Sequence, residues 1–167
     1  MGHVTGVNGN LCKVSFEGSV RKNEVGYIIV DDKRLKGEVI RINNGEASMQ
    51  IYEMSDGIKV GDPVEFTGGL MSIELGPGLL TQIFDGLQNP LPELAEKCGF
   101  FLERGVYLNP IPDREWEFTP CVKRGDRVAA GMAGGTVPEG LFRHQIMVPF
   151  TLKGEWTVKE IKEQGSY

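Results

Sequence analysis

The chain has 167 residues, of which 40% are hydrophobic and 25% charged, an ordinary globular composition that argues against disorder. Its net charge of −5 offers no basic surface for phosphates, so we expect no nucleic-acid partner. No apolar run approaches the roughly 18 residues that a membrane-spanning helix needs, so we expect no direct insertion into a membrane. The 23 glycines favour many tight turns between short strands.

The three cysteines are Cys12, Cys98 and Cys121, an odd number with no CxxC pair. This pattern predicts a reduced, cytosolic setting with small buried thiols. The cysteines do not form a metal-ligand spacing with His3 or His144, so no metal site is predicted.

The first 70 residues show the alternation of short, half-buried strands. Cys12, Val14 and Phe16 alternate with polar residues, and Asn43-Asn44-Gly45 is a strong hairpin signal. Further strands are predicted at 25–30, at 35–42 with a bulge near Gly37, at 47–51 and at 63–66. Five or six strands in about 65 residues predict a small closed antiparallel barrel, because closure removes exposed strand edges.

The segment 74–91 joins this part to the rest of the chain. It opens with a rigid turn, Gly76-Pro77-Gly78. Apolar residues then recur at helical spacing and predict a short helix: Leu79, Leu80, Ile83, Phe84 and Leu87. A second short helix is predicted at 91–98, with Gly99 as its C-terminal cap.

Strand patterning resumes from Val106, with Trp116 and Phe118 on one face, and continues at 146–149 and 153–161. The repeat of glycines and valines from Val122 onward resembles the barrel-sandwich fold of biotinyl and lipoyl carrier domains. Those carriers present a modified lysine at a hairpin tip, and the matching stretch 139–142 contains no lysine. We therefore expect the fold without the carrier chemistry.

Residue patterns alone predict no catalytic, cofactor-binding or metal-binding site. The sequence contains no GxxxxGK[ST] phosphate loop, no dinucleotide fingerprint, no GxSxG and no HExxH. The carboxylate pairs Glu115 with Glu117 and Glu53 with Asp56 are interpreted as solvated charges. His144 is interpreted as a hydrogen-bonded strand or turn residue.

The segment Glu74-Leu-Gly-Pro-Gly-Leu-Leu-Thr-Gln-Ile-Phe-Asp-Gly-Leu-Gln-Asn-Pro-Leu91 resembles the N-terminal part of the catalytic A (alpha) subunit of V/A-type rotary ATPases. The resemblance extends along the whole chain in order, through 35–40, 50–53, 57–62, Arg104-Gly105, 116–126, 135–139, 144–149 and 165–167. It implies a mainly β architecture in three parts. These are an N-terminal six-stranded antiparallel β-barrel at 1–70, a short helical connector at 71–105 leading toward a nucleotide domain, and a β-rich bulge of barrel-sandwich type at 106–167.

The resemblance also implies a function for the complete protein. Such a parent binds Mg-ATP or ADP and couples ATP hydrolysis or synthesis to proton or sodium transport. Its barrels and those of neighbouring A and B subunits form a ring in a hexameric head, the bulge contacts a peripheral stalk, and the complex is cytoplasmic and peripheral to the membrane. The family's nucleotide-binding residues lie beyond Tyr167, so the 167-residue chain alone is expected to be inactive. Leu79, Ile83, Phe84 and Leu87 are expected to pack against the nucleotide domain.

Two alternatives remain at this point. One is a free-standing acidic β-domain that acts as an adaptor or carrier-like interaction module. The other is a small autonomous enzyme, but the sequence contains no catalytic motif that supports it.

Overall fold

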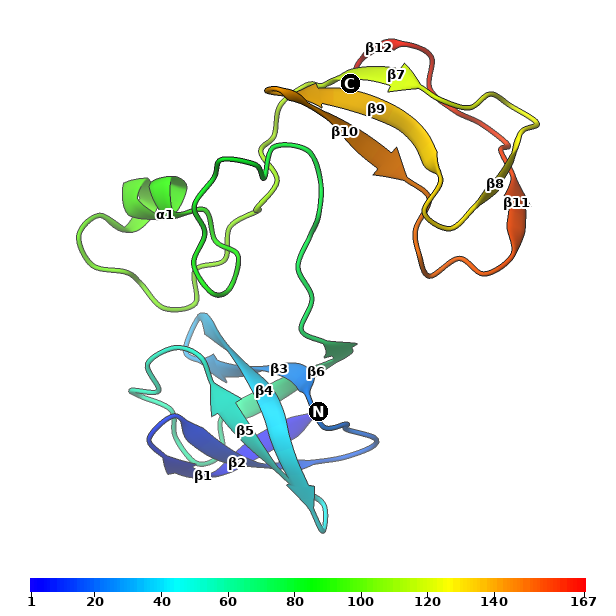
Figure 1. The fold of residues 1–167 in the computed structure, drawn as a ribbon. Coiled ribbons are helices and arrows are strands. Elements are labelled where there is room, and N and C mark those ends of the chain that lie inside the picture. Colours follow the sequence, from blue (N-terminus) through cyan, green and yellow to red (C-terminus); the bar gives the residue numbers. More distant parts are fainter. The chain divides into compact units, whose positions relative to one another are not determined.

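A computed structural model describes all 167 residues and divides them into two compact units. The first unit comprises 1–73 and 92–108, and the second comprises 74–91 and 109–167. The chain is mainly β, as predicted, and Figure 1 shows the strands of both parts and the single helix, α1.

The first unit is built on a closed six-stranded barrel, which confirms the prediction. Its strand order is β1-β2-β5-β4-β3-β6, and every neighbouring pair is antiparallel. The strands are β1 (Gly2–Asn8), β2 (Leu11–Phe16), β3 (Glu24–Val30), β4 (Lys33–Asn43), β5 (Glu46–Ile51) and β6 (Pro63–Leu70).

The barrel interior is filled by the alternating apolar residues of these strands. Cys12 and Val14 of β2 are fully buried, while Lys13 and Ser15 between them are exposed. The core also contains Val4, Ile28, Val30, Leu35, Val39, Ala47, Met49, Ile51, Ile58 and Val64. Burial of this continuous apolar set is the main source of the barrel's stability.

Two local predictions for the barrel had different outcomes. The Asn44-Gly45 hairpin is confirmed, since both residues have positive φ (45° and 81°), as a two-residue turn between twisted strands requires. The bulge predicted near Gly37 is wrong, because the register shift lies between Val39 and Arg41. Gly37 is needed for another reason: a Cβ there would lie 2.7 Å from the Gln50 carbonyl oxygen of the neighbouring strand.

The barrel closes along a short seam between β1 and β6. Only Gly2 with Val64 and His3 with Pro63 pair in register there. The seam is extended by the Val4 N–H, which donates to the Asp62 carbonyl at 2.9 Å, and by the Gly61 N–H, which donates to the Val4 carbonyl at 2.8 Å.

The helix α1 (Leu91–Cys98) is confirmed where the sequence predicted it. Leu94 is its buried residue, and the Gly99 N–H donates to the Ala95 carbonyl at 2.8 Å. Gly99 has φ of 67°, so it ends the helix in the left-handed conformation expected of a glycine cap. No helix of the protein is both long and apolar enough to cross a lipid bilayer.

The second unit contains a four-stranded sheet in the order β10-β9-β7-β12 and a two-stranded sheet of β11 and β8. The strands are β7 (Glu117–Pro120), β8 (Arg127–Ala129), β9 (Ala133–Glu139), β10 (Phe142–Met147), β11 (Glu155–Thr157) and β12 (Gly165–Ser166). The hairpin of β9 and β10 turns at Gly140 and Leu141, and the Leu141 side chain is fully exposed at its tip.

The helix predicted over residues 79–87 is wrong. This stretch forms turns, and Phe84 instead pairs with Pro90 in an isolated antiparallel bridge. The Asp85 carboxylate accepts the N–H groups of Leu87 at 2.8 Å and Asn89 at 2.7 Å, so a side chain takes backbone donors that a helix would need. The strand pattern expected from Val106 begins only with β7 at Glu117.

Candidate functional site

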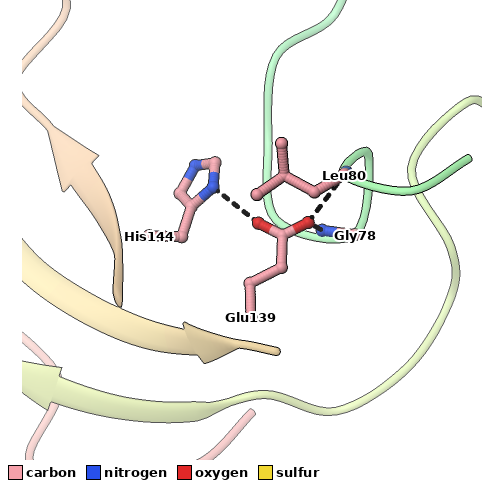
Figure 2. A network of polar contacts seen from close by, with 4 residues as sticks. All are labelled: Gly78, Leu80, Glu139 and His144. Carbon is pink, nitrogen blue, oxygen red and sulfur yellow. Dashed lines mark hydrogen bonds and ion pairs between the residues drawn. The ribbon is translucent and has the colours of Figure 1, made fainter. Parts of the chain in front are cut away.

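Glu139 is a buried carboxylate that holds the segment after the Gly76-Pro77-Gly78 turn. It is the last residue of β9 and is only 5% exposed. Its Oε1 atom accepts the backbone N–H of Gly78 at 2.6 Å and that of Leu80 at 3.0 Å (Figure 2). One charged oxygen thus satisfies two loop donors, and hydrogen bonds to an ionised acceptor are stronger than neutral ones.

His144 binds the other oxygen of the same carboxylate. Its Nδ1 atom lies 2.8 Å from Glu139 Oε2, as Figure 2 shows. The hairpin register explains the contact: Phe142 pairs with Glu139, and His144 follows two residues later on the same face of β10. Both carboxylate oxygens of Glu139 are therefore engaged.

The pKa of Glu139 reports the balance of these contacts. Burial raises the pKa, but the hydrogen bonds from Leu80, Gly78 and His144 and the charge of His144 together lower it below its ordinary value. The carboxylate is consequently held in its ionised form, which is the form that accepts the loop N–H groups.

The turn that Glu139 holds lies close to residues 111 and 112 at both of its glycines. A Cβ on Gly76 would lie 2.7 Å from the Ile111 side chain, and one on Gly78 would collide with the Pro112 ring. Gly78 also has φ of 99°, which side chains disfavour. The close approach to the Pro112 ring therefore requires glycine at position 78, whereas at position 76 the nearest atom is the end of the flexible Ile111 side chain, which can shift.

A second carboxylate, Glu53, performs a similar task in the first unit. Its Oε1 accepts the Gly105 N–H at 2.6 Å, and its Oε2 accepts the Tyr107 hydroxyl at 2.7 Å. The Lys36 N–H is shared between the Tyr107 hydroxyl at 2.9 Å and Glu53 Oε2 at 3.3 Å. The interpretation of Glu53 as a solvated charge is wrong, because these bonds join it to a backbone segment 52 residues away.

Residues 103–107 are fastened to the barrel by further contacts. Arg104 donates to the carbonyl oxygens of Met54 and Asp56, and Lys33 forms an ion pair with Glu103 at 3.4 Å. We call the segment 103–107 the strap. Burial, followed by the hydrogen bond and charge of Glu53, raises the pKa of Tyr107, so the phenol stays a hydrogen-bond donor.

The four residues predicted to pack against another domain are not gathered on a helical face. Ile83 is 66% exposed, whereas Leu79, Phe84 and Leu87 are half-buried. All four lie in the turns of 79–90, and their proposed packing partner remains a prediction.

The structure also shows the surroundings of the other residues that the sequence analysis named. His144 is a hydrogen-bonded strand residue, as predicted. Glu115 and Glu117 are exposed. All three cysteines are free thiols, but only Cys12 is buried; Cys98 is half-buried and Cys121 exposed, so the prediction of three buried thiols is wrong.

Sequence reasoning did not predict the roles of Glu139, Glu53 and Tyr107. The contacts of Glu139 with Gly78 and of Tyr107 with Glu53 join residues 61 and 54 positions apart, and no local pattern marks such pairs. One signal was present: Glu139 precedes a two-residue turn and His144 lies two residues after the strand position that pairs with Glu139, which places both on one face of a hairpin.

These residues do not fit a site for Mg-ATP. No group of three or more His, Cys, Asp or Glu side chains lies close enough together to hold a metal ion. The sequence also lacks a glycine-rich loop with the lysine that binds phosphates.

Comparison with known proteins agrees with the two-part architecture. Residues 4–68 match the family described as "ATP synthase alpha/beta family, beta-barrel domain". Residues 110–167 match the family described as "ATPsynthase alpha/beta subunit barrel-sandwich domain". The first match covers the closed barrel, and the second covers the sheets of β7 to β12. The chain therefore belongs to the ATP synthase alpha/beta family.

Within that family, the chain is similar to V-type ATP synthase alpha chains. It is 58% identical to the V-type ATP synthase alpha chain of Treponema denticola over 167 residues, which are 99% of this chain and 28% of the relative. It is 54% identical to the V-type ATP synthase alpha chain 1 of Treponema pallidum, with the same two coverages. It is also 54% identical to that of Borreliella afzelii, covering 99% of this chain and 29% of the relative. The chain thus spans less than a third of the length of these relatives. Its similarity to them does not favour the adaptor or carrier alternative.

Proposed function

We propose that this chain is the N-terminal part of the catalytic alpha chain of a V-type ATP synthase, and that its own role is assembly and support of the catalytic head. The observation that carries the proposal is identity of 49–58% to V-type ATP synthase alpha chains over 99% of the chain. Matches to both the barrel and the barrel-sandwich families support the same assignment.

The complete protein, in this proposal, hydrolyses or synthesises ATP and couples this reaction to proton or sodium transport. Mg-ATP and ADP are bound by residues outside these 167, and the 167-residue chain alone is inactive. The proposed parts are the barrel at 1–70, the connector at 71–105 and the bulge at 106–167.

The proposed partners follow from the same assignment. The barrel forms a ring with neighbouring alpha chains and with beta chains (the B subunits) in a hexameric head, and the bulge contacts a peripheral stalk on the cytoplasmic side of the membrane. Closure of the barrel supports this role, since a closed sheet meets its neighbours through side chains and not through open strand edges. Leu79, Ile83, Phe84 and Leu87 pack against the nucleotide domain, and the 66% exposure of Ile83 is consistent with such a contact.

A chimaeric alpha chain tests the proposal. The corresponding residues of the Treponema denticola alpha chain are replaced by these 167 residues, and the chain is assembled with its beta chains. We expect a complex with ATPase activity. A matched chimaera carrying Leu35→Asp, at a fully buried barrel position, is expected not to assemble.

Two results would contradict the proposal. The first is a chimaera that folds but does not associate with beta chains, which would remove the assembly role. The second is ATP turnover by the purified 167-residue chain, which would favour an autonomous enzyme.

A further inference from the structure

The loop held by Glu139 contains two residues whose backbone conformation their side chains disfavour. Positive φ occurs at five non-glycine residues: Asn23, Asp31, Asn44, Thr81 and Gln88. Asn and Asp tolerate this left-handed region, which accounts for the first three. Thr81 has φ of 69° and is β-branched, and Gln88 has φ of 66°. Both unfavourable cases fall within the loop 76–90.

Apolar packing does not hold Thr81 in this conformation. Thr81 and the following Gln82 are exposed, and Ile83 is 66% exposed. The preceding residue is held by a polar contact, since the Leu80 N–H donates to Glu139 Oε1 at 3.0 Å. The turn around Thr81 also has one bond of its own, because the Gln82 N–H donates to the Leu79 carbonyl at 3.3 Å. The Glu139 bond is the shorter of the two and has an ionised acceptor, so it is the stronger contact that opposes the strain at Thr81.

The other strained residue is also held by contacts between side chain and backbone. Gln88 Nε2 donates to the Glu74 carbonyl at 2.6 Å, and the Glu74 N–H donates to Gln88 Oε1 at 2.8 Å. On its far side, Asn89 Nδ2 donates to the Asp85 carboxylate at 2.8 Å. The Gln88 end is thus held by contacts with Glu74 and by the bond between Asn89 and Asp85. The Thr81 end is held by one turn bond and by Glu139.

We propose that the loop 76–90 is a two-state conformational switch, which the hydrogen bond between Glu139 and the Leu80 N–H holds in its strained state. When that bond breaks, Thr81 relaxes to negative φ, so release of the bond and relaxation of the backbone favour each other. Re-forming the bond requires Thr81 to return to the left-handed region. The inference concerns this loop alone and holds whether or not the complete protein acts on ATP.

Amide hydrogen exchange at Leu80 in the 167-residue protein tests the switch. In Thr81→Gly the strain is absent, because glycine adopts positive φ without a Cβ penalty. We expect the Leu80 amide to exchange about 5- to 30-fold more slowly than in the wild type. Gln82→Gly is the matched control: Gln82 does not have positive φ, so glycine there only adds freedom and should speed exchange.

Glu139→Gln tests the other half of the switch. The neutral amide accepts hydrogen bonds more weakly than the carboxylate, so Leu80 exchange should become faster, and adding Thr81→Gly should partly restore protection. Amides of β9 serve as the folding reference and should be unchanged in Thr81→Gly and in Gln82→Gly. Leu80 exchange in Thr81→Gly that is unchanged, faster, or slowed equally throughout β9 would overturn the proposal. A Thr81→Gly variant that fails to fold would overturn it as well, because the substitution should remove strain.

Discussion

The Tyr107 hydroxyl donates a 2.7 Å hydrogen bond to the Glu53 carboxylate, 54 positions earlier in the chain. The same hydroxyl accepts the Lys36 N–H at 2.9 Å, and the Tyr107 ring meets the Tyr27 ring edge-on with centroids 5.9 Å apart. The strap is therefore attached to the barrel by a partly buried polar centre with an aromatic contact beside it. In a low-dielectric setting, loss of one member leaves its partners without their bonds.

Tyr107→Phe should destabilise the first unit. The substitution keeps the ring but removes the hydroxyl that joins Glu53 to the Lys36 N–H, and we expect the free energy of unfolding to fall by about 1–3 kcal/mol. Urea unfolding measures the change. The control is Tyr52→Phe, because the Tyr52 hydroxyl also binds a carboxylate, Glu38 at 2.6 Å, but from an exposed side chain. Tyr52→Phe should lower the free energy of unfolding by less than about 1 kcal/mol. Equal losses in the two variants would show that the Tyr107 hydroxyl stabilises the protein no more than an exposed one.

Alkaline pH should weaken the barrel through Tyr52. Burial, followed by the hydrogen bond and charge of Glu38, raises the pKa of Tyr52 to about 12 from an ordinary value of 10.0. Because the folded pKa is the higher one, this contribution to stability is complete below pH 10 and is lost as the pH rises toward 12. An ultraviolet titration of tyrosinate should show the late transition, and Glu38→Gln should move it toward the ordinary pKa. A Tyr52 that titrates at its ordinary pKa in the wild type would refute this account.

Acid should release the Glu139 contacts. Burial raises the Glu139 pKa, but the three hydrogen bonds and the charge of His144 lower it further, so the folded pKa lies below the ordinary value of 4.5. The stabilisation is therefore present above pH 4.5 and is lost as the pH falls through the folded pKa. NMR chemical shifts of the Gly78 and Leu80 amides should follow this titration. In Glu139→Gln they should show no transition in that range, and a transition that persists would assign it to another group.

Adjacent glycines of β9 should differ sharply in their tolerance of alanine. A Cβ on Gly135 would collide with the Phe118 ring, whereas the nearest atom to a Cβ on Gly134 is the Ile146 carbonyl oxygen at 3.5 Å. Gly135→Ala should therefore lower the free energy of unfolding of the second unit by about 1–3 kcal/mol through overpacking. Gly134→Ala should be close to neutral. Thermal unfolding of the two variants gives the comparison, and similar losses would mean that Phe118 moves aside easily.

The barrel could be predicted because its signals are local. The alternation at Cys12, Val14 and Phe16 and the Asn44-Gly45 turn act over a few residues, and the structure contains both as expected. The predicted helix at 79–87 was wrong for a physical reason. Its apolar spacing matched the helical period, but the Asp85 side chain captured backbone donors, and Thr81 and Gln88 adopted positive φ.

The candidate site was less predictable than the barrel. The hairpin that carries Glu139 and His144 has a sequence signal, and the hydrogen-bonded state of His144 was predicted. The capture of the Gly78 and Leu80 amides by Glu139 depends on tertiary packing across about 60 positions, where side-chain chemistry alone does not select a partner. Glu53 is the same case, since a carboxylate near a turn has the same sequence pattern whether it is solvated or bound.

The short seam between β1 and β6 sets an order of events during folding. β1 and β2 are consecutive and can pair as soon as residue 16 is available, but Gly2 must wait for Val64 before the ring of strands can close. Forming a contact between residues so far apart carries the largest loop-closure entropy in the barrel, and it is offset by only two register pairs and two further backbone hydrogen bonds. On a ribosome, which delivers the N-terminus first, β1 therefore exists for a time as an unsealed strand. The seam should be the last part of the barrel to form and the first to open.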